Sequence, residues 1–138
     1  PIGSILISNK QFITKARRIR KVFGGGMRQA GFMAASGIYA LKNNIDRLRM
    51  DHENAASVGK HLLEKSFVNS VLPVTTNIVI FEVTEGADAK RIVQQLNDQD
   101  IRCLNISPGR IRMVFHLDIN NNDVDLILKG LDSIDRII

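Results

Sequence analysis

The sequence is short of several residue types, and each shortage narrows what the protein can be. Cys103 is its only cysteine, so no internal disulfide can form and no cysteine cluster can hold a metal. The three histidines lack the HxxxH and HExxH spacings of metal sites, and we predict no metal. No apolar run is long enough to cross a membrane, and the first residues lack the cationic start of a signal peptide. We therefore expect a cytoplasmic protein without a membrane partner.

Acidic residues are also missing from one part of the chain. Eight lysines and arginines precede Asp46 without one acidic residue, whereas 11 basic residues accompany 14 acidic ones from Asp46 onward. A basic block of this kind faces solvent, the phosphate of a cofactor, or nucleic acid. Only Phe12 and Phe23 are aromatic near these charges and no nucleic-acid-binding motif occurs, so we rank the three in that order. Lys21 lies in the block, where a lysine can form a Schiff base, although a surface lysine is the default.

Hydrophobic periodicity predicts a helical first half and a mixed second half. The first seventy residues contain a strand and then three helices, the first of them capped by Asn9: 3–8, 10–23, 27–42 and 46–67. The last seventy residues contain a β-α-β-β-α lobe, whose helix in the middle is capped by Asp88: 76–83, 88–100, 101–106, 110–117 and 120–138.

Three consecutive glycines, Gly24, Gly25 and Gly26, follow the cationic helix and precede a helix rich in small residues. Glycine commonly follows a helix C-terminus, so the run is typical of a helix stop. A glycine-rich turn before a helix also presents backbone N–H groups to an anion such as phosphate. Because three glycines complete no phosphate motif, spacing alone favours the helix stop.

Polar side chains share one face of the strand expected at 110–117. Alternation places Arg112, Val114 and His116 on the same side. An arginine and a histidine there form either a carboxylate-binding wall or a surface pair on an edge strand, and the pattern favours neither.

Several segments carry a resemblance to a known family: PIGSILIS, ARRIRKVFGGGMRQAGFMAASGIYAL, RLRMDHENA, TNIV and RMVFHLD. In this order they resemble the C-terminal part of low-specificity threonine aldolases, which are pyridoxal-phosphate enzymes of the β-eliminating lyase group. The resemblance implies the α/β aminotransferase-like fold. Residues 1–69 then form the C-terminal end of the large cofactor-binding domain and its connecting helices, and residues 70–138 form the small α+β domain.

The resemblance implies pyridoxal 5'-phosphate as the cofactor. In the family, the lysine that holds it lies in a Ser-Lys-Gly segment just before a PxGS sequence, and this sequence begins with PIGS. We therefore expect the Schiff-base lysine to lie outside these residues and the segment alone to be inactive.

The resemblance also assigns roles to residues. Arg112 clamps the substrate carboxylate, and His116 on the same face binds substrate as well. Arg110 is an alternative ligand for the substrate carboxylate, but Arg112 matches the family's RxVxHLD pattern. Lys21 takes a catalytic position, and the three glycines with Arg28 bind the cofactor, with Arg28 reaching its phosphate across a subunit boundary.

The implied reaction cleaves a β-hydroxy-α-amino acid, threonine or allo-threonine, to glycine and acetaldehyde, within threonine catabolism and glycine biosynthesis. The family usually forms homotetramers, and we expect a homo-oligomer without nucleic acid. A second hypothesis is a non-catalytic binding or assembly fragment with a basic N-terminal face.

Overall fold

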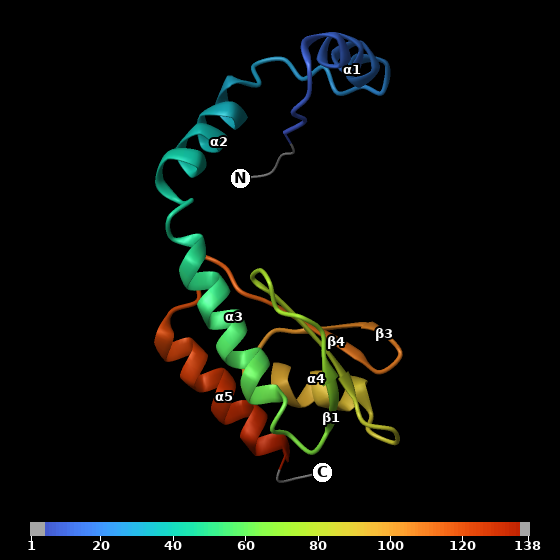
Figure 1. Ribbon diagram of the computed structural model, residues 1–138, viewed down its shortest axis with the longest axis vertical. Coiled ribbons are helices and arrows are strands. Elements are labelled where there is room, and N and C mark those ends of the chain that lie inside the picture. Colours follow the sequence, from blue (N-terminus) through green and yellow to red (C-terminus); the bar gives the residue numbers. More distant parts are fainter. Residues whose placement is uncertain (1–4, 136–138) are drawn as a thin grey trace. The chain divides into compact units, whose positions relative to one another are not determined.

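The computed structural model describes residues 5–135, which form two compact units (Figure 1). Unit 1 ends at Asp46 and contains helices α1 (Lys10–Val22) and α2 (Gly31–Asn43). Unit 2 begins at Arg47, and its described residues contain three helices and a four-stranded sheet. The helices are α3 (Leu48–Leu62), α4 (Ala89–Asn97) and α5 (Asn121–Asp135), and the strands are β1 (Val68–Val71), β2 (Ile78–Val83), β3 (Leu104–Ser107) and β4 (Arg110–Val114).

Helix α1 begins where the sequence predicts. The side chain of Asn9 accepts a hydrogen bond from the N–H of Phe12 at 2.9 Å, which confirms the N-cap. The strand expected just before it is wrong for residues 5–8, which have no regular structure, and residues 3 and 4 lie outside the described range. A strand needs a partner for its backbone groups, and all the described strands belong to unit 2.

Helix α2 begins four residues later than the predicted start at residue 27. Gln29 has a φ of +52°, a left-handed conformation that interrupts helical geometry, so Arg28 lies in a turn and not on a helix. The helix ends at Asn43 with Asn44 as its C-cap, one residue later than the predicted end at residue 42.

The described part of unit 1, residues 5–46, has no core of its own. None of its described residues is buried, and large apolar side chains such as Phe12, Phe23 and Phe32 are exposed. A unit of this composition has to bury these side chains against other protein to become stable.

The sheet of unit 2 is fully antiparallel, with strand order β1-β2-β4-β3. Alternate residues of β2 and β4, including Phe81, Ile111 and Met113, are buried against the helices. Residues of the opposite face, such as Val114, remain accessible. One face therefore carries the core, and the other is available for a site.

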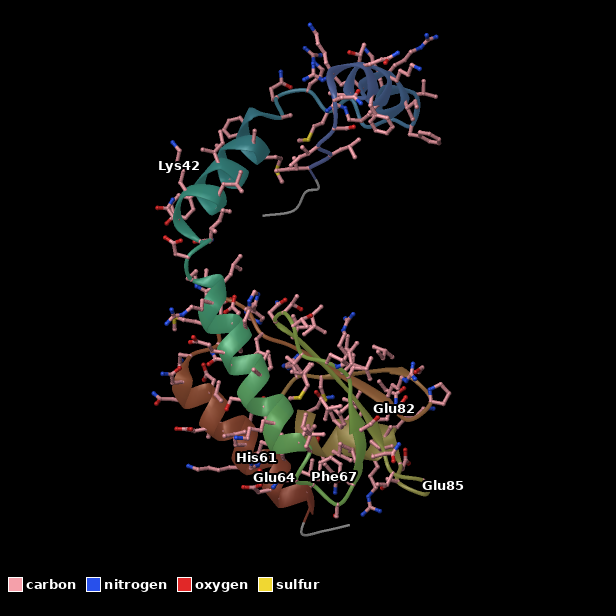
Figure 2. All side chains as sticks on the ribbon, in the orientation of Figure 1. Lys42, His61, Glu64, Phe67, Glu82 and Glu85 are labelled. Atoms are coloured by element: carbon pink, nitrogen blue, oxygen red, sulfur yellow. The ribbon has the colours of Figure 1, made fainter. Side chains whose placement is uncertain are left out.

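Helices α3 and α5 lie side by side (Figure 1). Asp132 of α5 ties α5 to the end of α3, because one of its oxygens lies 2.7 Å from Nε2 of His61 and 2.5 Å from Nζ of Lys65. Figure 2 labels His61 near the C-terminal end of α3. The hydrogen bonds from Lys65 and His61 lower the pKa of Asp132 below its usual range.

The mixed second half is largely confirmed. β2, α4 with Asp88 as its N-cap, β4 and α5 lie within the predicted ranges, and β3 begins at Leu104 instead of residue 101. Strand β1 was not predicted, so the lobe is β-β-α-β-β-α. Helix α3 is shorter than expected and belongs to unit 2, which begins 23 residues before the predicted boundary at 70. The predicted boundary between the large and the small domain of a longer protein, at residue 70, stays a prediction.

Candidate functional site

A cavity of about 700 Å³ lies at the end of the sheet where β4 ends and β3 begins, beside the end of α4. Its volume is in the range of small-molecule sites. It is lined by Gln94, Asn97, Asp98, Arg102, Cys103, Leu104, Arg112, Val114 and His116. The three residues that strand alternation placed on one face, Arg112, Val114 and His116, thus meet in one cavity.

Strand register positions Arg112 on the accessible face of the sheet. It lies between Ile80 of β2 and Leu104 of β3, its partners in the two ladders. These neighbours are apolar, so they shield the stem of the arginine from water. The guanidinium is therefore held on a β-sheet and not on a mobile loop.

Arg112 has an unusual hydrogen-bond deficit. Its Nε is buried and has no hydrogen-bond partner, and none of the described carboxylates forms an ion pair with its guanidinium. An unpaired buried donor costs free energy unless a ligand satisfies it, and more when it is charged. The side chain is thus suited to an incoming anion.

Arg110, two residues away on the same face, is already neutralised. Its Nε and Nη2 lie 2.6 and 2.5 Å from Oε1 of Glu82, its cross-strand partner on β2. Hydrogen bonds from Arg110 and from the hydroxyl of Ser70 hold the pKa of Glu82 below its usual range, so the carboxylate stays charged. Arg110 does not line the cavity.

His116 lies just beyond the end of β4, at the wall of the cavity. Its Nδ1 is 3.5 Å from Oδ2 of Asp118 and 3.4 Å from the N–H of that residue. In the described part of the chain, its Nε2 has no hydrogen-bond partner. One edge of the ring is therefore engaged and the other can contact a ligand.

Six of the nine lining residues were not predicted from the sequence, and Arg102 and Cys103 are the two of them with the most chemical interest. Arg102 lies in the loop before β3, where no periodicity marks the direction of a side chain. Cys103 is buried, and this burial raises the pKa of its thiol to about 11. A thiol with this pKa stays protonated at neutral pH, so Cys103 forms part of the cavity wall and does not act as a nucleophile.

The glycine run ends α1. Gly24 has a φ of +79°, its N–H donates to the carbonyl of Lys21 at 3.1 Å, and the N–H of Gly25 donates to that of Arg20 at 2.8 Å. This pair of bonds is the Schellman motif, which satisfies the last carbonyls of a helix. The helix stop favoured by spacing is therefore present, and a phosphate would not find these two N–H groups free. The cofactor role of the three glycines stays a prediction.

The remaining predicted site residues of unit 1 are exposed cations. Lys21 lies in the last turn of α1 and Arg28 in the turn before α2, and neither forms an ion pair with a described residue. They belong to unit 1, whereas Arg112 and His116 belong to unit 2. The roles of all four residues stay predictions.

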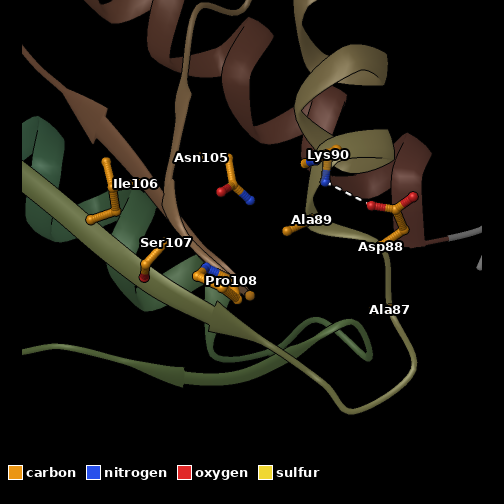
Figure 3. A pocket seen from close by; sticks show the side chains of 9 residues that line it. Ala87, Asp88, Ala89, Lys90, Asn105, Ile106, Ser107 and Pro108 are labelled. Atoms are coloured by element: carbon orange, nitrogen blue, oxygen red, sulfur yellow. Dashed lines mark hydrogen bonds between the residues drawn. The ribbon is translucent and has the colours of Figure 1, made fainter.

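A second cavity, of about 660 Å³, lies at the start of α4 and beside the β3–β4 turn (Figure 3). The carboxylate of Asp88 accepts the N–H groups of Lys90 at 2.9 Å and Arg91 at 3.3 Å. Because this cap already occupies the helix N-terminus, the cavity is a weaker candidate than the one at Arg112.

Two further features of the described residues bear on function. Residues 5–135 contain no group of three or more histidine, cysteine, aspartate or glutamate side chains placed to hold a metal ion. Within the same range, none of the helices has the length and apolar character needed to cross a membrane.

Two comparisons of the sequence with known proteins, with family models and with curated relatives, point to the same family. Residues 1–86 match the β-eliminating lyase family. The low specificity L-threonine aldolase of Escherichia coli (strain K12) is 40% identical over 124 residues, which cover 90% of this chain and 36% of that protein. A probable low-specificity L-threonine aldolase 2 of Arabidopsis thaliana is 36% identical over 97% of this chain and 39% of its own length. The chain thus spans little more than a third of these relatives.

Among solved structures, the histidinol-phosphate aminotransferase from Clostridium acetobutylicum matches with a TM-score of 0.52. The match covers 62% of this chain and 26% of that chain at 13% sequence identity. A likeness at this identity concerns the fold alone, and it confirms the expected aminotransferase-like α/β class.

Proposed function

The chain belongs to the β-eliminating lyase family, and on this basis we propose that it is part of a threonine aldolase. The proposed reaction breaks the Cα–Cβ bond of threonine or allo-threonine and yields glycine and acetaldehyde. The names of the relatives and their identity along nearly the whole chain support this assignment. Because the chain spans about a third of those relatives, the activity is proposed for the complete enzyme.

The unpaired guanidinium of Arg112 is the observation that carries the proposal. An α-amino acid substrate presents a carboxylate, and arginine binds both of its oxygens through two parallel N–H donors. Arg110 already binds Glu82, so it is not free for this role. We therefore assign the substrate carboxylate to Arg112, with His116 as a second contact in the same cavity.

This contact has a chemical purpose beyond affinity. A substrate held at its carboxylate cannot turn freely, so the bond that is to break keeps one orientation toward the rest of the site. Arg112 is fixed by two neighbouring strands and transmits that rigidity to the substrate.

The family implies pyridoxal phosphate, and the residues of unit 1 fit its phosphate. Arg28 is an exposed cation without a carboxylate partner among the described residues, as a phosphate ligand needs to be. Because Gly24 and Gly25 use their N–H groups to end α1, we assign them to the shape of the turn that leads to Arg28, and Gly26 lies two residues before Arg28. When bound, pyridoxal phosphate supplies the electron sink for cleavage of the Cα–Cβ bond. The lysine that holds it is proposed to lie outside these 138 residues.

We further propose that the complete enzyme is a cytoplasmic homo-oligomer. Unit 1 supports the assembly because its described residues include none that is buried and many exposed apolar side chains. Residues 24–26 are proposed to lie near a neighbouring subunit, which Arg28 reaches.

The proposal is tested by assaying glycine and acetaldehyde release from threonine by the complete purified enzyme, with and without added pyridoxal phosphate. We expect both products in equal amounts, and only with the cofactor. A complete enzyme that releases neither, while the chain binds nucleic acid in a salt-dependent manner, would favour the non-catalytic alternative.

A further inference from the structure

The arginines of unit 2 differ in whether a carboxylate neutralises them. Three form ion pairs at 2.5–3.0 Å: Arg47 with Asp51, Arg49 with Glu53, and Arg110 with Glu82. Arg91, Arg102 and Arg112 form none with the described residues. Of these, Arg102 and Arg112 line the same cavity, whereas Arg91 lies on α4 outside it.

The acidic residue of this cavity does not neutralise them. The carboxylate of Asp98 accepts a hydrogen bond from Nε2 of Gln94 at 2.7 Å. Arg102 and His116 also line an adjoining cavity of about 330 Å³, which contains Asp100, Asp118 and Asp123.

The three carboxylates of the adjoining cavity do not pair with Arg102. Asp118 lies 3.5 Å from His116, and Asp123 accepts the N–H of Asn120 at 2.8 Å. None of the three carboxylates forms an ion pair with Arg102. The larger cavity is therefore lined by two arginines, the exposed Arg102 and the half-buried Arg112, that form no ion pair with a described carboxylate. A substrate α-carboxylate needs only one of them.

We infer that Arg102 binds a second anionic group of the substrate, so the site takes β-hydroxy-α-amino acids whose side chain carries a carboxylate. The inference rests on the proposed function, because it gives the α-carboxylate to Arg112. The apolar side chains of Leu104 and Val114 form the wall of the same cavity and suit the carbon chain between two carboxylates.

The smallest substrate of this kind is 3-hydroxyaspartate, which has a carboxylate where threonine has a methyl group. Its cleavage balances without another reactant. The Cα–Cβ bond breaks, its electron pair remains on Cα, and Cα takes up a proton to give glycine. The β-hydroxyl loses its proton, and Cβ becomes the aldehyde carbon of glyoxylate.

A titration of the 138-residue chain tests the second anion site without cofactor or turnover. Succinate and butyrate have four carbons each and differ by one carboxylate, and amide chemical shifts near Arg102 and Arg112 report binding. Since a hydrogen bond to a charged group is worth a factor of ten or more, we expect succinate to bind roughly tenfold tighter.

Two arginine variants test whether Arg102 causes the preference for succinate over butyrate. Arg102→Leu should abolish it, and Arg91→Leu, which removes an unpaired arginine outside the cavity, should keep it. Equal binding of the two acids, or an equal loss in both variants, overturns the inference, because only overall charge would then matter.

Kinetics of the complete enzyme test the substrate class. Arg102→Leu should lower kcat/KM for 3-hydroxyaspartate roughly tenfold more than it lowers kcat/KM for threonine. An equal loss for both substrates overturns the inference, because Arg102 would then share the α-carboxylate with Arg112. A wild-type enzyme that cleaves neither substrate overturns the proposed function and the substrate class with it, while the titration decides the anion site separately.

Discussion

Glu82 binds Arg110 through a single carboxylate oxygen, at 2.6 Å from Nε and 2.5 Å from Nη2, across the β2–β4 ladder. This pairing separates two arginines that stand two positions apart in the sequence. The positive charge of Arg110 is balanced outside the cavity, and that of Arg112 is left for a ligand inside it. The difference between them comes from a residue 28 positions upstream of Arg110.

The first prediction compares these two arginines in the complete enzyme. Arg112→Lys should raise KM for threonine and lower kcat, with a loss of about tenfold or more in kcat/KM, because lysine keeps the charge but not the paired donors. Arg110→Lys should change little, since a lysine can still pair with Glu82. Steady-state kinetics of both variants decide the matter. A crippling Arg110 change with a mild Arg112 change would reverse the two roles.

The second prediction concerns the phosphate of the cofactor. Arg28→Ala should weaken retention of pyridoxal phosphate by about tenfold, because a charge-assisted hydrogen bond is lost. Stability should change by no more than about 0.5 kcal/mol, because Arg28 is exposed and in a turn. Cofactor absorbance after dialysis gives the affinity. Arg17→Ala, which removes an exposed cation from α1, is the control, and equal retention in both variants would remove Arg28 from the site.

The structural prediction from sequence succeeded where a pattern is local. The shared face of Arg112 and His116 follows from the period of two in a strand, and it needs no knowledge of partners. The N-caps at Asn9 and Asp88 follow from residue type, because these side chains accept backbone N–H groups within three residues.

The features that the sequence did not predict depend on irregular backbone geometry or on contacts between distant segments. Strand β1 has four residues and a register shift between Val68 and Ser70, so it offers no clean alternation. The late start of α2 depends on the left-handed backbone of Gln29, which residue type does not indicate. The ion pair of Arg110 with Glu82 depends on register with a distant strand, and Arg102 reaches the cavity from a loop.

The third prediction concerns the lysines of the chain. None of them lies in a Ser-Lys-Gly segment, so we expect the 138-residue chain alone to release no glycine from threonine. Borohydride reduction with pyridoxal phosphate, followed by peptide mass analysis, should label no single lysine preferentially. Selective labelling of Lys21 together with glycine release would place the cofactor lysine within this chain.

The fourth prediction uses the single thiol. Because burial raises the pKa of Cys103 to about 11 from 9.0, its thiolate fraction at pH 8 is about a hundredfold smaller than that of an exposed thiol. Alkylation by iodoacetamide should be slow at pH 8 and should rise about tenfold per pH unit toward pH 11. The same chain in denaturant is the control and should react quickly. Rapid alkylation of the folded chain at pH 8 would show that Cys103 is accessible.

The last prediction concerns the link between α3 and α5. Hydrogen bonds from Lys65 and His61 lower the pKa of Asp132 from 3.8 in the folded protein, so the carboxylate stabilises the fold above that pH. This stabilisation should disappear as the pH falls from about 3.8 through the lowered folded-state pKa, because protonation then removes the negative charge that Lys65 and His61 contact. Asp132→Asn should lower the urea midpoint at pH 7 and have a much smaller effect near pH 2.

Asp125→Asn is the matched control, since Asp125 lies on the same helix and has no bonded partner among the described residues. It should leave the urea midpoint nearly unchanged at both pH values. If the two variants lower the midpoint equally at pH 7, the effect arises from the charge of α5 as a whole and the link through Asp132 contributes nothing specific. An Asp132→Asn effect that persists unchanged near pH 2 would mean that the side chain acts by packing and not by charge.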